Sequence, residues 1–207
     1  MEILIATHNL AKLARYKKIV EKIPGVHCLS LADLGIAEKV EEIFETSTEN
    51  ARHKAQIYGD LSGKITLAID EAVNTNFLPD HAQPGVYVRR FSGNRKELTD
   101  SEVIEVWKKI FATYPQADKQ FIWDFALAFY NPRTASQGVQ MVEQISYVAK
   151  EFSTRETNGY PMSAFLSPVA GGESYLDMSD AAEEQEDQES FAAFLAVFAK
   201  WLKMNNQ

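Results

Sequence analysis

The sequence contains very little cysteine. Cys28 is the single one among 207 residues, so no disulfide can form within the chain. The sequence also lacks the basic start and following apolar run of a secretory signal peptide. No segment approaches the roughly 18 consecutive apolar residues of a membrane span. These absences argue against a disulfide-stabilised or membrane-spanning protein, and we expect a cytoplasmic protein with no membrane partner.

Positive charge is also scarce. The chain carries 21 Lys and Arg against 29 Asp and Glu, a net charge of -8. Non-specific nucleic-acid binding depends on clustered Lys and Arg, so we expect no nucleic-acid partner. An anionic ligand would need a metal ion or a local basic patch. Internal repeats and linker-like segments are lacking too, which at this length predicts a single domain over residues 1–207.

Hydrophobic patterning predicts strands that alternate with helices. Short apolar runs predict strands at 2–7, 26–31 and 66–70, and two longer runs at 121–130 and 139–149 predict a hairpin. Apolar residues at helical spacing predict helices over 10–22, 47–58, 100–113 and 190–204. This order of elements predicts an α/β fold, in which helices flank a long, twisted, mixed sheet.

The segment 40–70 contains three acidic residues around one predicted helix. Glu41 and Glu42 precede the helix, a capping box from Thr46 to Glu49 opens it, and Asp70 ends the next strand. If the helix packs beside the strand, Glu42 and Asp70 can meet at one end of a sheet, where a hard cation could bind. In the alternative interpretation, the two glutamates are solvated loop charges and Asp70 caps a turn.

The turn after the first strand carries polar side chains at the start of a predicted helix. Thr7, Asn9 and Lys12 supply a hydroxyl, an amide and an amine there. Free backbone N–H groups and the helix dipole favour a phosphate at such a position. The alternative is that Asn9 is a plain N-cap and Lys12 a solvated lysine.

Three segments in the first half of the chain resemble one known family in order and spacing. The segment ETSTENARHKA resembles the E-x-G-x-T-F-x-E-N-A-x-x-K-A block of the inosine triphosphate pyrophosphatase family. Before it, ILIATHNLAKL resembles the family's I-V-L-A-T-x-N-x-x-K-x start, and after it PGVYVRRFSG resembles P-G-V-Y-S-A-R-Y-S-G. Members hydrolyse non-standard purine nucleoside triphosphates to monophosphate and pyrophosphate.

The resemblance implies a fold and a set of functional residues. It implies two lobes with a cleft between them, the second lobe built largely from residues 115–165, and a possible homodimer. It also implies a nucleotide as substrate and Mg²⁺ as cofactor. The implied residues are Thr7, Asn9 and Lys12 for phosphate, Glu42 and Asp70 for the metal, and Asp70 as the general base.

The chain departs from the family pattern around the third strand. The family reads L-A-D-D-S-G-L, and its first aspartate falls on Ile69 here, while Glu71 takes the place of its serine. Successive strand residues point to opposite faces, so Glu71 and Ile69 share one face while Asp70 lies on the other. Additional candidate site residues are Glu71, Lys54 at the family's lysine position, and Arg89, which adds a positive charge.

The second half departs further. Met162 stands at the position of the aspartate with which the family recognises a 6-oxopurine base. Glu183, Gln188 and Glu189 stand where the family has Lys, His and Arg, and we expect 183–189 to form a solvated acidic loop. The sequence therefore leaves two hypotheses: a metal-dependent nucleoside triphosphate pyrophosphatase with altered base and phosphate specificity, or a catalytically inactive homologue that binds nucleotides or proteins.

Overall fold

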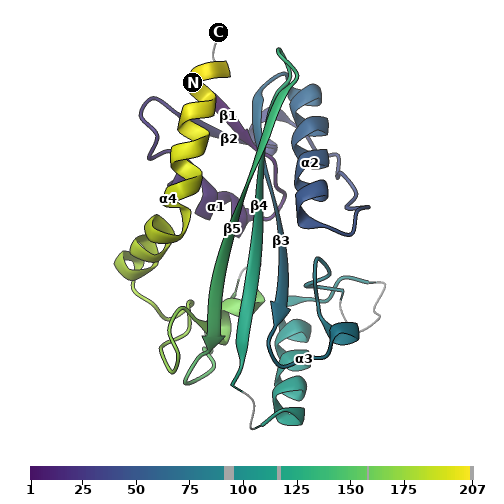
Figure 1. Cartoon of the computed structure of the whole chain (residues 1–207), viewed down its shortest axis with the longest axis vertical. Coiled ribbons are helices and arrows are strands. Elements are labelled where there is room, and N and C mark those ends of the chain that lie inside the picture. Colours follow the sequence, from purple (N-terminus) through teal and green to yellow (C-terminus); the bar gives the residue numbers. More distant parts are fainter. Residues whose placement is uncertain (91–95, 116–117, 158, 206–207) are drawn as a thin grey trace. The chain divides into compact units, whose positions relative to one another are not determined.

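The computed structural model describes residues 1–90, 96–115, 118–157 and 159–205, and Figure 1 shows their arrangement. The strands are β1 (Glu2–Ile5), β2 (His27–Ser30), β3 (Ile65–Thr75), β4 (Gln120–Asn131), β5 (Ser136–Val148) and β6 (Leu166–Ser167). The helices are α1 (Leu10–Val20), α2 (Ser47–Ser62), α3 (Asp100–Thr113) and α4 (Asp180–Asn205). Among the described residues, no helix combines the length and apolar composition needed to cross a membrane.

The strands form one mixed sheet in the order β2-β1-β3-β4-β5-β6. β1 pairs with β2 and β3 in parallel, whereas β5 and β6 are antiparallel. β4 and β5 are neighbours joined by the turn at 132–135, which confirms the predicted hairpin. The predicted fold class, an α/β fold with helices around a long mixed sheet, is confirmed.

The chain groups into two compact units. The first contains Met1–Glu71, Asp124–Val142 and Asp187–Gln207, and the second contains Ala72–Trp123 and Glu143–Glu186. In the first unit, α2 lies on one side of the sheet, and α1 and α4 lie on the other (Figure 1). β3 and β4 run through both units, because each strand contributes residues to each of them.

Alternation along β4 builds the two faces of the first unit. Ala126 and Ala128 belong to a buried cluster that includes Ala51 and Ala55 of α2. The odd-numbered residues face the other way. Phe125 contacts Phe191 of α4, and Phe129 contacts Phe198 and Trp201, with ring centroids 4.8 to 5.8 Å apart. The period of two that strand geometry imposes thus assigns each side chain to one helix layer.

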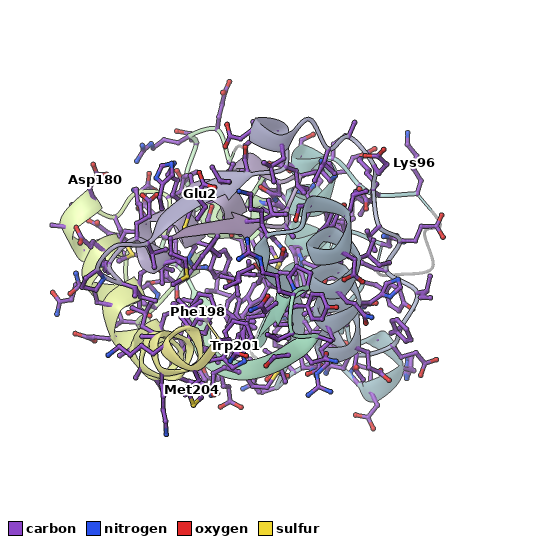
Figure 2. All side chains as sticks on the ribbon, turned by 90° about the horizontal axis from the view of Figure 1, so that it is seen from above. Glu2, Lys96, Asp180, Phe198, Trp201 and Met204 are labelled. Carbon is purple, nitrogen blue, oxygen red and sulfur yellow. The ribbon has the colours of Figure 1, made fainter. Side chains whose placement is uncertain are left out.

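The helix α4 presents an aromatic face to the sheet. Figure 2 shows Phe198 and Trp201 pointing from α4 toward the strands, while Met204 points away. Phe191, Phe194 and Phe198 are fully buried. Their spacing of three and four residues keeps them on one side of the helix, which confirms the core-facing helix predicted at 190–204.

The second unit has a separate aromatic core. Trp107 of α3 lies against Phe121 of β4, with ring centroids 4.8 Å apart, and against Phe165 at 6.1 Å. A capping box between Thr99 and Glu102 opens α3. Edge-to-face and tilted aromatic pairs of this kind add to the stabilisation from apolar burial.

The predicted acidic loop at 183–189 is wrong. These residues are helical, because α4 already begins at Asp180. Apart from Asp187 the run consists of Glu and Gln, which are strong helix formers, and Asp180 and Glu183 lie in the first turn, where the helix dipole favours negative charge. An acidic run is therefore compatible with an exposed helix as well as with a loop. The predicted strand at 66–70 is likewise longer, since β3 spans Ile65–Thr75.

Candidate functional site

The centre of the candidate site is a buried lysine between two carboxylates, all within the first unit. Lys54 Nζ lies 2.6 Å from Asp70 Oδ1 and 2.9 Å from Glu42 Oε1, and it also donates to the Ile69 carbonyl at 2.9 Å. Asp70 is only 4% exposed. Its partner Glu42 keeps 38% of its side chain exposed. Lys54 thus joins a carboxylate in the interior to one at the surface, and we call these three residues the lysine cluster.

The helix α2 positions the lysine cluster. Thr46 is the N-cap, and its hydroxyl accepts from the Glu49 N–H at 3.2 Å, as the sequence predicts. Asn50 lies one turn before Lys54 on the same helical face. Its amide donates to the Phe44 carbonyl and accepts from the Phe44 N–H, both at 3.0 Å, and its Nδ2 lies 3.4 Å from Asp70 Oδ2.

Asn50 therefore ties α2 to the segment that carries Glu42 and to the end of the Asp70 side chain. No local pattern in the sequence assigns Asn50 a role, although it belongs to the E-N-A block of the family resemblance. Its spacing of four from Lys54 was the signal available.

The segment just before Glu42 is held in place by hydrogen bonds with Tyr58 and His8. The Tyr58 hydroxyl donates to the Glu38 carbonyl at 2.9 Å and accepts from the Val40 N–H at 3.1 Å. His8 Nε2 lies 2.9 Å from the same carbonyl and 3.2 Å from the Tyr58 hydroxyl. These bonds fix the chain just before Glu42 against α2 and against the turn after β1.

Burial and charge act in opposite directions on the pKa values of the lysine cluster. Burial raises the pKa of Asp70 to about 6; Lys54 opposes this shift and the neighbouring Glu42 charge adds to it. Burial would also raise the pKa of Glu42, but the Lys54 ammonium brings it below its ordinary value. Burial would lower the pKa of Lys54, but Asp70 and Glu42 together raise it. Lys54 is therefore a cation, Glu42 an anion, and Asp70 a carboxyl group poised to exchange a proton near neutral pH.

The donors of the lysine cluster suit a hard divalent cation. Mg²⁺ binds through one or two carboxylates together with waters and substrate phosphates. Glu42 and Asp70 converge on one ammonium group, so their oxygens already surround a positive charge. Among residues 1–90, 96–115, 118–157 and 159–205, no group of three or more His, Cys, Asp and Glu side chains could hold a metal. The set therefore fits a cation that shares its coordination with a ligand rather than a closed structural site.

The predicted phosphate-binding turn opens α1. The Asn9 side chain accepts from the backbone N–H groups of Ala11 and Lys12 at 2.9 and 3.2 Å, so Asn9 is an N-cap. Thr7 Oγ1 accepts from the Asn9 N–H at 3.1 Å. Lys12 is not a purely solvated lysine, because its Nζ forms an ion pair with Glu71 Oε2 at 3.1 Å.

Lys12 also acts on the lysine cluster through its charge, because it lowers the pKa values of Glu42 and Asp70. The turn and the cluster are therefore electrostatic neighbours within the first unit.

The remaining candidates lie elsewhere. In the second unit, the Arg89 guanidinium binds Asp100 Oδ1 at 2.7 Å and the Gly159 carbonyl at 3.0 Å. Met162 is 4% exposed and belongs to the aromatic core of that unit. Glu183, Gln188 and Glu189 lie on α4.

The acidic run of α4 contains one buried member. Asp187 Oδ1 accepts from Arg15 Nε at 2.9 Å and from Nη2 at 2.8 Å. The Arg15 guanidinium lies 5.2 Å from the Phe191 ring centroid and 5.5 Å from that of Phe125. Asp187 thus anchors α4 to α1, whereas Glu183, Gln188 and Glu189 of the same run are exposed.

Comparisons with known proteins show what the chain is similar to. The model of the Ham1 family matches residues 3–145. A dITP/XTP pyrophosphatase of Bacillus licheniformis is 30% identical over 159 residues, which cover 77% of each chain. A dITP/XTP pyrophosphatase of Streptococcus pneumoniae is 26% identical over 201 residues, 96% of each chain. Among solved structures, a HAM1 protein from Coxiella burnetii covers 99% of each chain with a TM-score of 0.71 and 20% identity.

Proposed function

The chain belongs to the Ham1 family, and from this membership and the lysine cluster we propose that it is a metal-dependent nucleoside triphosphate pyrophosphatase. The reaction would convert a nucleoside triphosphate to the monophosphate and pyrophosphate. Two relatives that match 77% and 96% of this chain are named dITP/XTP pyrophosphatases. The observation that carries the proposal is the convergence of Asp70, Lys54 and Glu42 at 2.6 and 2.9 Å.

In this proposal Asp70 accepts the proton of the attacking water. A general base works best when its pKa lies near the operating pH, and burial has raised the pKa of Asp70 to about 6. Lys54 holds Asp70 Oδ1 at 2.6 Å, Asn50 Nδ2 lies 3.4 Å from Asp70 Oδ2, and the Asp70 side chain also hydrogen-bonds to Glu42. Lys54 and Asn50 thus fix the orientation of the Asp70 carboxylate, and Asp70 as a whole is assigned the role of base.

The phosphates of the substrate are assigned to the turn that opens α1. Thr7, Asn9 and Lys12 present a hydroxyl, an amide and an ammonium group at the positive end of the helix dipole. Glu42 and Asp70 would hold the divalent cation, with Mg²⁺ the expected ion. When bound, that ion neutralises charge on the phosphates and lowers the pKa of a coordinated water.

The proposal includes relaxed base selectivity. Position 162 carries a methionine packed in the core of the second unit, so it supplies no charged acceptor to a base. A site built on hydrogen bonds can reject an analogue by about 10⁴-fold, whereas an apolar pocket achieves only about 10- to 200-fold. We propose that discrimination between inosine and adenosine nucleotides falls in the lower range. A homodimer and a cytoplasmic location stay predictions from the sequence.

A hydrolysis screen tests this function. Purine and pyrimidine nucleoside triphosphates, modified bases included, are incubated with the full chain and Mg²⁺, and orthophosphate and pyrophosphate are quantified separately. We expect pyrophosphate with the corresponding monophosphate from at least one substrate, and none after chelation of the metal. Release of orthophosphate alone would indicate a different phosphohydrolase reaction and would contradict the proposal.

One observation favours the second candidate, an inactive nucleotide-binding homologue. Lys12, the cation assigned to phosphate, is already paired with Glu71 at 3.1 Å. Measurable nucleotide binding without any hydrolysis across the whole screen would support this second candidate. Pyrophosphate release that disappears in Asp70→Asn would exclude it.

A further inference from the structure

Glu71 is a buried carboxylate in which one oxygen has a polar partner and the other has none among the described residues. Its Oε2 pairs with Lys12 Nζ at 3.1 Å. Its Oε1 is buried and has no hydrogen-bond partner in the part of the chain that the structure describes. Only 8% of the side chain is exposed. Buried polar atoms are nearly always bonded, because an unpaired one costs free energy, so this oxygen calls for an explanation.

Glu71 lies on the opposite face of β3 from Asp70 of the lysine cluster. Asp70 points toward α2, where it meets Lys54, whereas Glu71 points toward α1, where it meets Lys12. The two lysines of the site are thus each held by a carboxylate of the same strand. Within the described part of the chain, Glu71 is the ion-pair partner of Lys12, whose side chain is 21% exposed.

The groups that a phosphate would use at the start of α1 are already engaged by the chain. Asn9 Oδ1 accepts from the N–H groups of Ala11 and Lys12. Glu71 neutralises the Lys12 ammonium. A phosphate that reaches this turn therefore finds Lys12 already paired with the Glu71 carboxylate. The negative charges of the phosphate and of Glu71 repel each other when both lie beside Lys12.

On the basis of the proposed function, we propose that Glu71 determines specificity. It competes with the substrate's phosphates for the Lys12 ammonium and so limits the phosphate charge that the site accepts. When a phosphate takes Lys12, Glu71 loses its one partner and both of its oxygens are left buried and unpaired. The unfavourable free energy of this exchange grows with the negative charge that the substrate brings near Glu71. The site should therefore gain little affinity from each additional phosphate.

The alternative role for Glu71 is to position Lys12 for the phosphate. The two roles predict opposite effects of removing the charge. A competing carboxylate weakens polyphosphate binding, so Glu71→Gln should bind more tightly. A positioning carboxylate improves binding, so the same variant should bind more weakly. Glutamine keeps the shape of the side chain and removes its charge, and it replaces one acceptor oxygen by a hydrogen-bond donor.

The test uses base-independent probes on the full chain. Binding of inorganic pyrophosphate and of tripolyphosphate is measured by calorimetry in Mg²⁺ for the unmodified protein and for Glu71→Gln. We expect the affinity for tripolyphosphate to rise by at least about fivefold in Glu71→Gln, and the affinity for pyrophosphate to rise less. In a Lys12→Ala background, Glu71→Gln should give no gain, because the competition needs both partners.

A matched control removes a carboxylate elsewhere in the first unit. Glu2 pairs with Lys64 at 2.6 Å near the surface, so Glu2→Gln changes the net charge by the same amount. The inference would be overturned if Glu2→Gln and Glu71→Gln raised the affinity for tripolyphosphate equally, or if the rise persisted without Lys12. Either result would indicate a general effect of net charge. Unchanged or weaker binding in Glu71→Gln would assign a positioning role instead. Glu71→Ser serves as the second variant if the glutamine does not fold.

The same measurements separate this inference from the proposed function. If the unmodified protein releases pyrophosphate from a nucleotide and Glu71→Gln shows no gain, only the role of Glu71 fails. If the unmodified protein neither hydrolyses a nucleotide nor binds either polyphosphate, the proposed function fails, and the inference fails with it.

Discussion

Asp70 and Glu71 are adjacent in β3, yet their carboxylates pair with lysines of two different helices. Asp70 meets Lys54 of α2 at 2.6 Å, and Glu71 meets Lys12 of α1 at 3.1 Å. One peptide step reverses the direction of a strand side chain, so two neighbouring acids serve both faces of the sheet. This relationship separates the proposed chemistry at Asp70 from the proposed control of phosphate charge at Glu71.

Replacing Asp70 by asparagine should abolish hydrolysis while the fold is retained. Asparagine keeps the volume but loses the proton acceptor and an anionic metal ligand. We expect the rate to fall by about 10²- to 10⁴-fold, the usual contribution of general base catalysis, or by more if the metal is lost as well. Pyrophosphate release measures the effect, and circular dichroism checks the fold. An unchanged rate would remove Asp70 from the mechanism.

Activity should depend on pH through Asp70. Its pKa in the folded protein is raised to about 6 from the ordinary 3.8, and a general base must be deprotonated. We therefore expect kcat/KM to fall as the pH drops through about 6 and to level off above it, with a lower apparent midpoint at high Mg²⁺. A profile that stays flat down to pH 5 would indicate another base.

The same shift should appear in the stability of the metal-free protein. The folded state binds more protons than the unfolded state between the two pKa values of Asp70. This residue therefore favours folding at low pH and loses that contribution as the pH rises through about 6. The free energy of unfolding of the native protein relative to Asp70→Asn should decrease by on the order of 2 kcal/mol between pH 4 and pH 8. Urea titrations with a chelator at both pH values measure it, and a constant difference would contradict it.

Removing the buried cation should destabilise the first unit. Lys54→Met keeps an unbranched side chain that is one atom shorter, but it leaves Asp70 and Glu42 without the ammonium group between them. Breaking one side of a buried ion pair costs about 3–5 kcal/mol. Urea unfolding should show this loss in the absence of metal. Adding Asp70→Asn to Lys54→Met should recover part of it, and a double variant less stable than Lys54→Met would show that charge is not the cause.

Met162→Asp should disrupt packing before it changes base selectivity. The side chain is 4% exposed and lies in the core cluster with Trp107 and Phe165. An aspartate there would be buried without a partner, and we expect a loss of about 3 kcal/mol or more in the free energy of unfolding. Met162→Leu is the matched control and should cost less than about 1.5 kcal/mol. Equal stability of the two variants would show that position 162 is open to solvent in solution.

Much of the fold could be predicted because its elements have regular apolar spacing. The alternation in β4 and the aromatic spacing in α4 specify which side of each element is buried. The opposite directions of Asp70 and Glu71 also follow from the strand period alone. What could not be predicted is which helix each acid meets, because that depends on the packing of α1 and α2 against the sheet.

The acidic run shows where sequence patterns are ambiguous. A series of Glu, Gln and Asp is compatible both with an exposed helix and with a loop. Only helix propensity and the position of Asp180 favour the helix. The buried role of Asp187 depends on Arg15, which is distant in sequence, so no local pattern could indicate it. The bridging role of Asn50 was visible only as a spacing of four from Lys54.

The composition of the first unit has a consequence for synthesis. Its third segment begins at Asp187, so translation must pass Trp201 before α4 can cover both Phe125 and Phe129. Until then, that side of β4 remains without its aromatic partners. Nascent chains that stall before α4 should therefore be prone to aggregation and dependent on chaperones, although they already contain every residue of the lysine cluster.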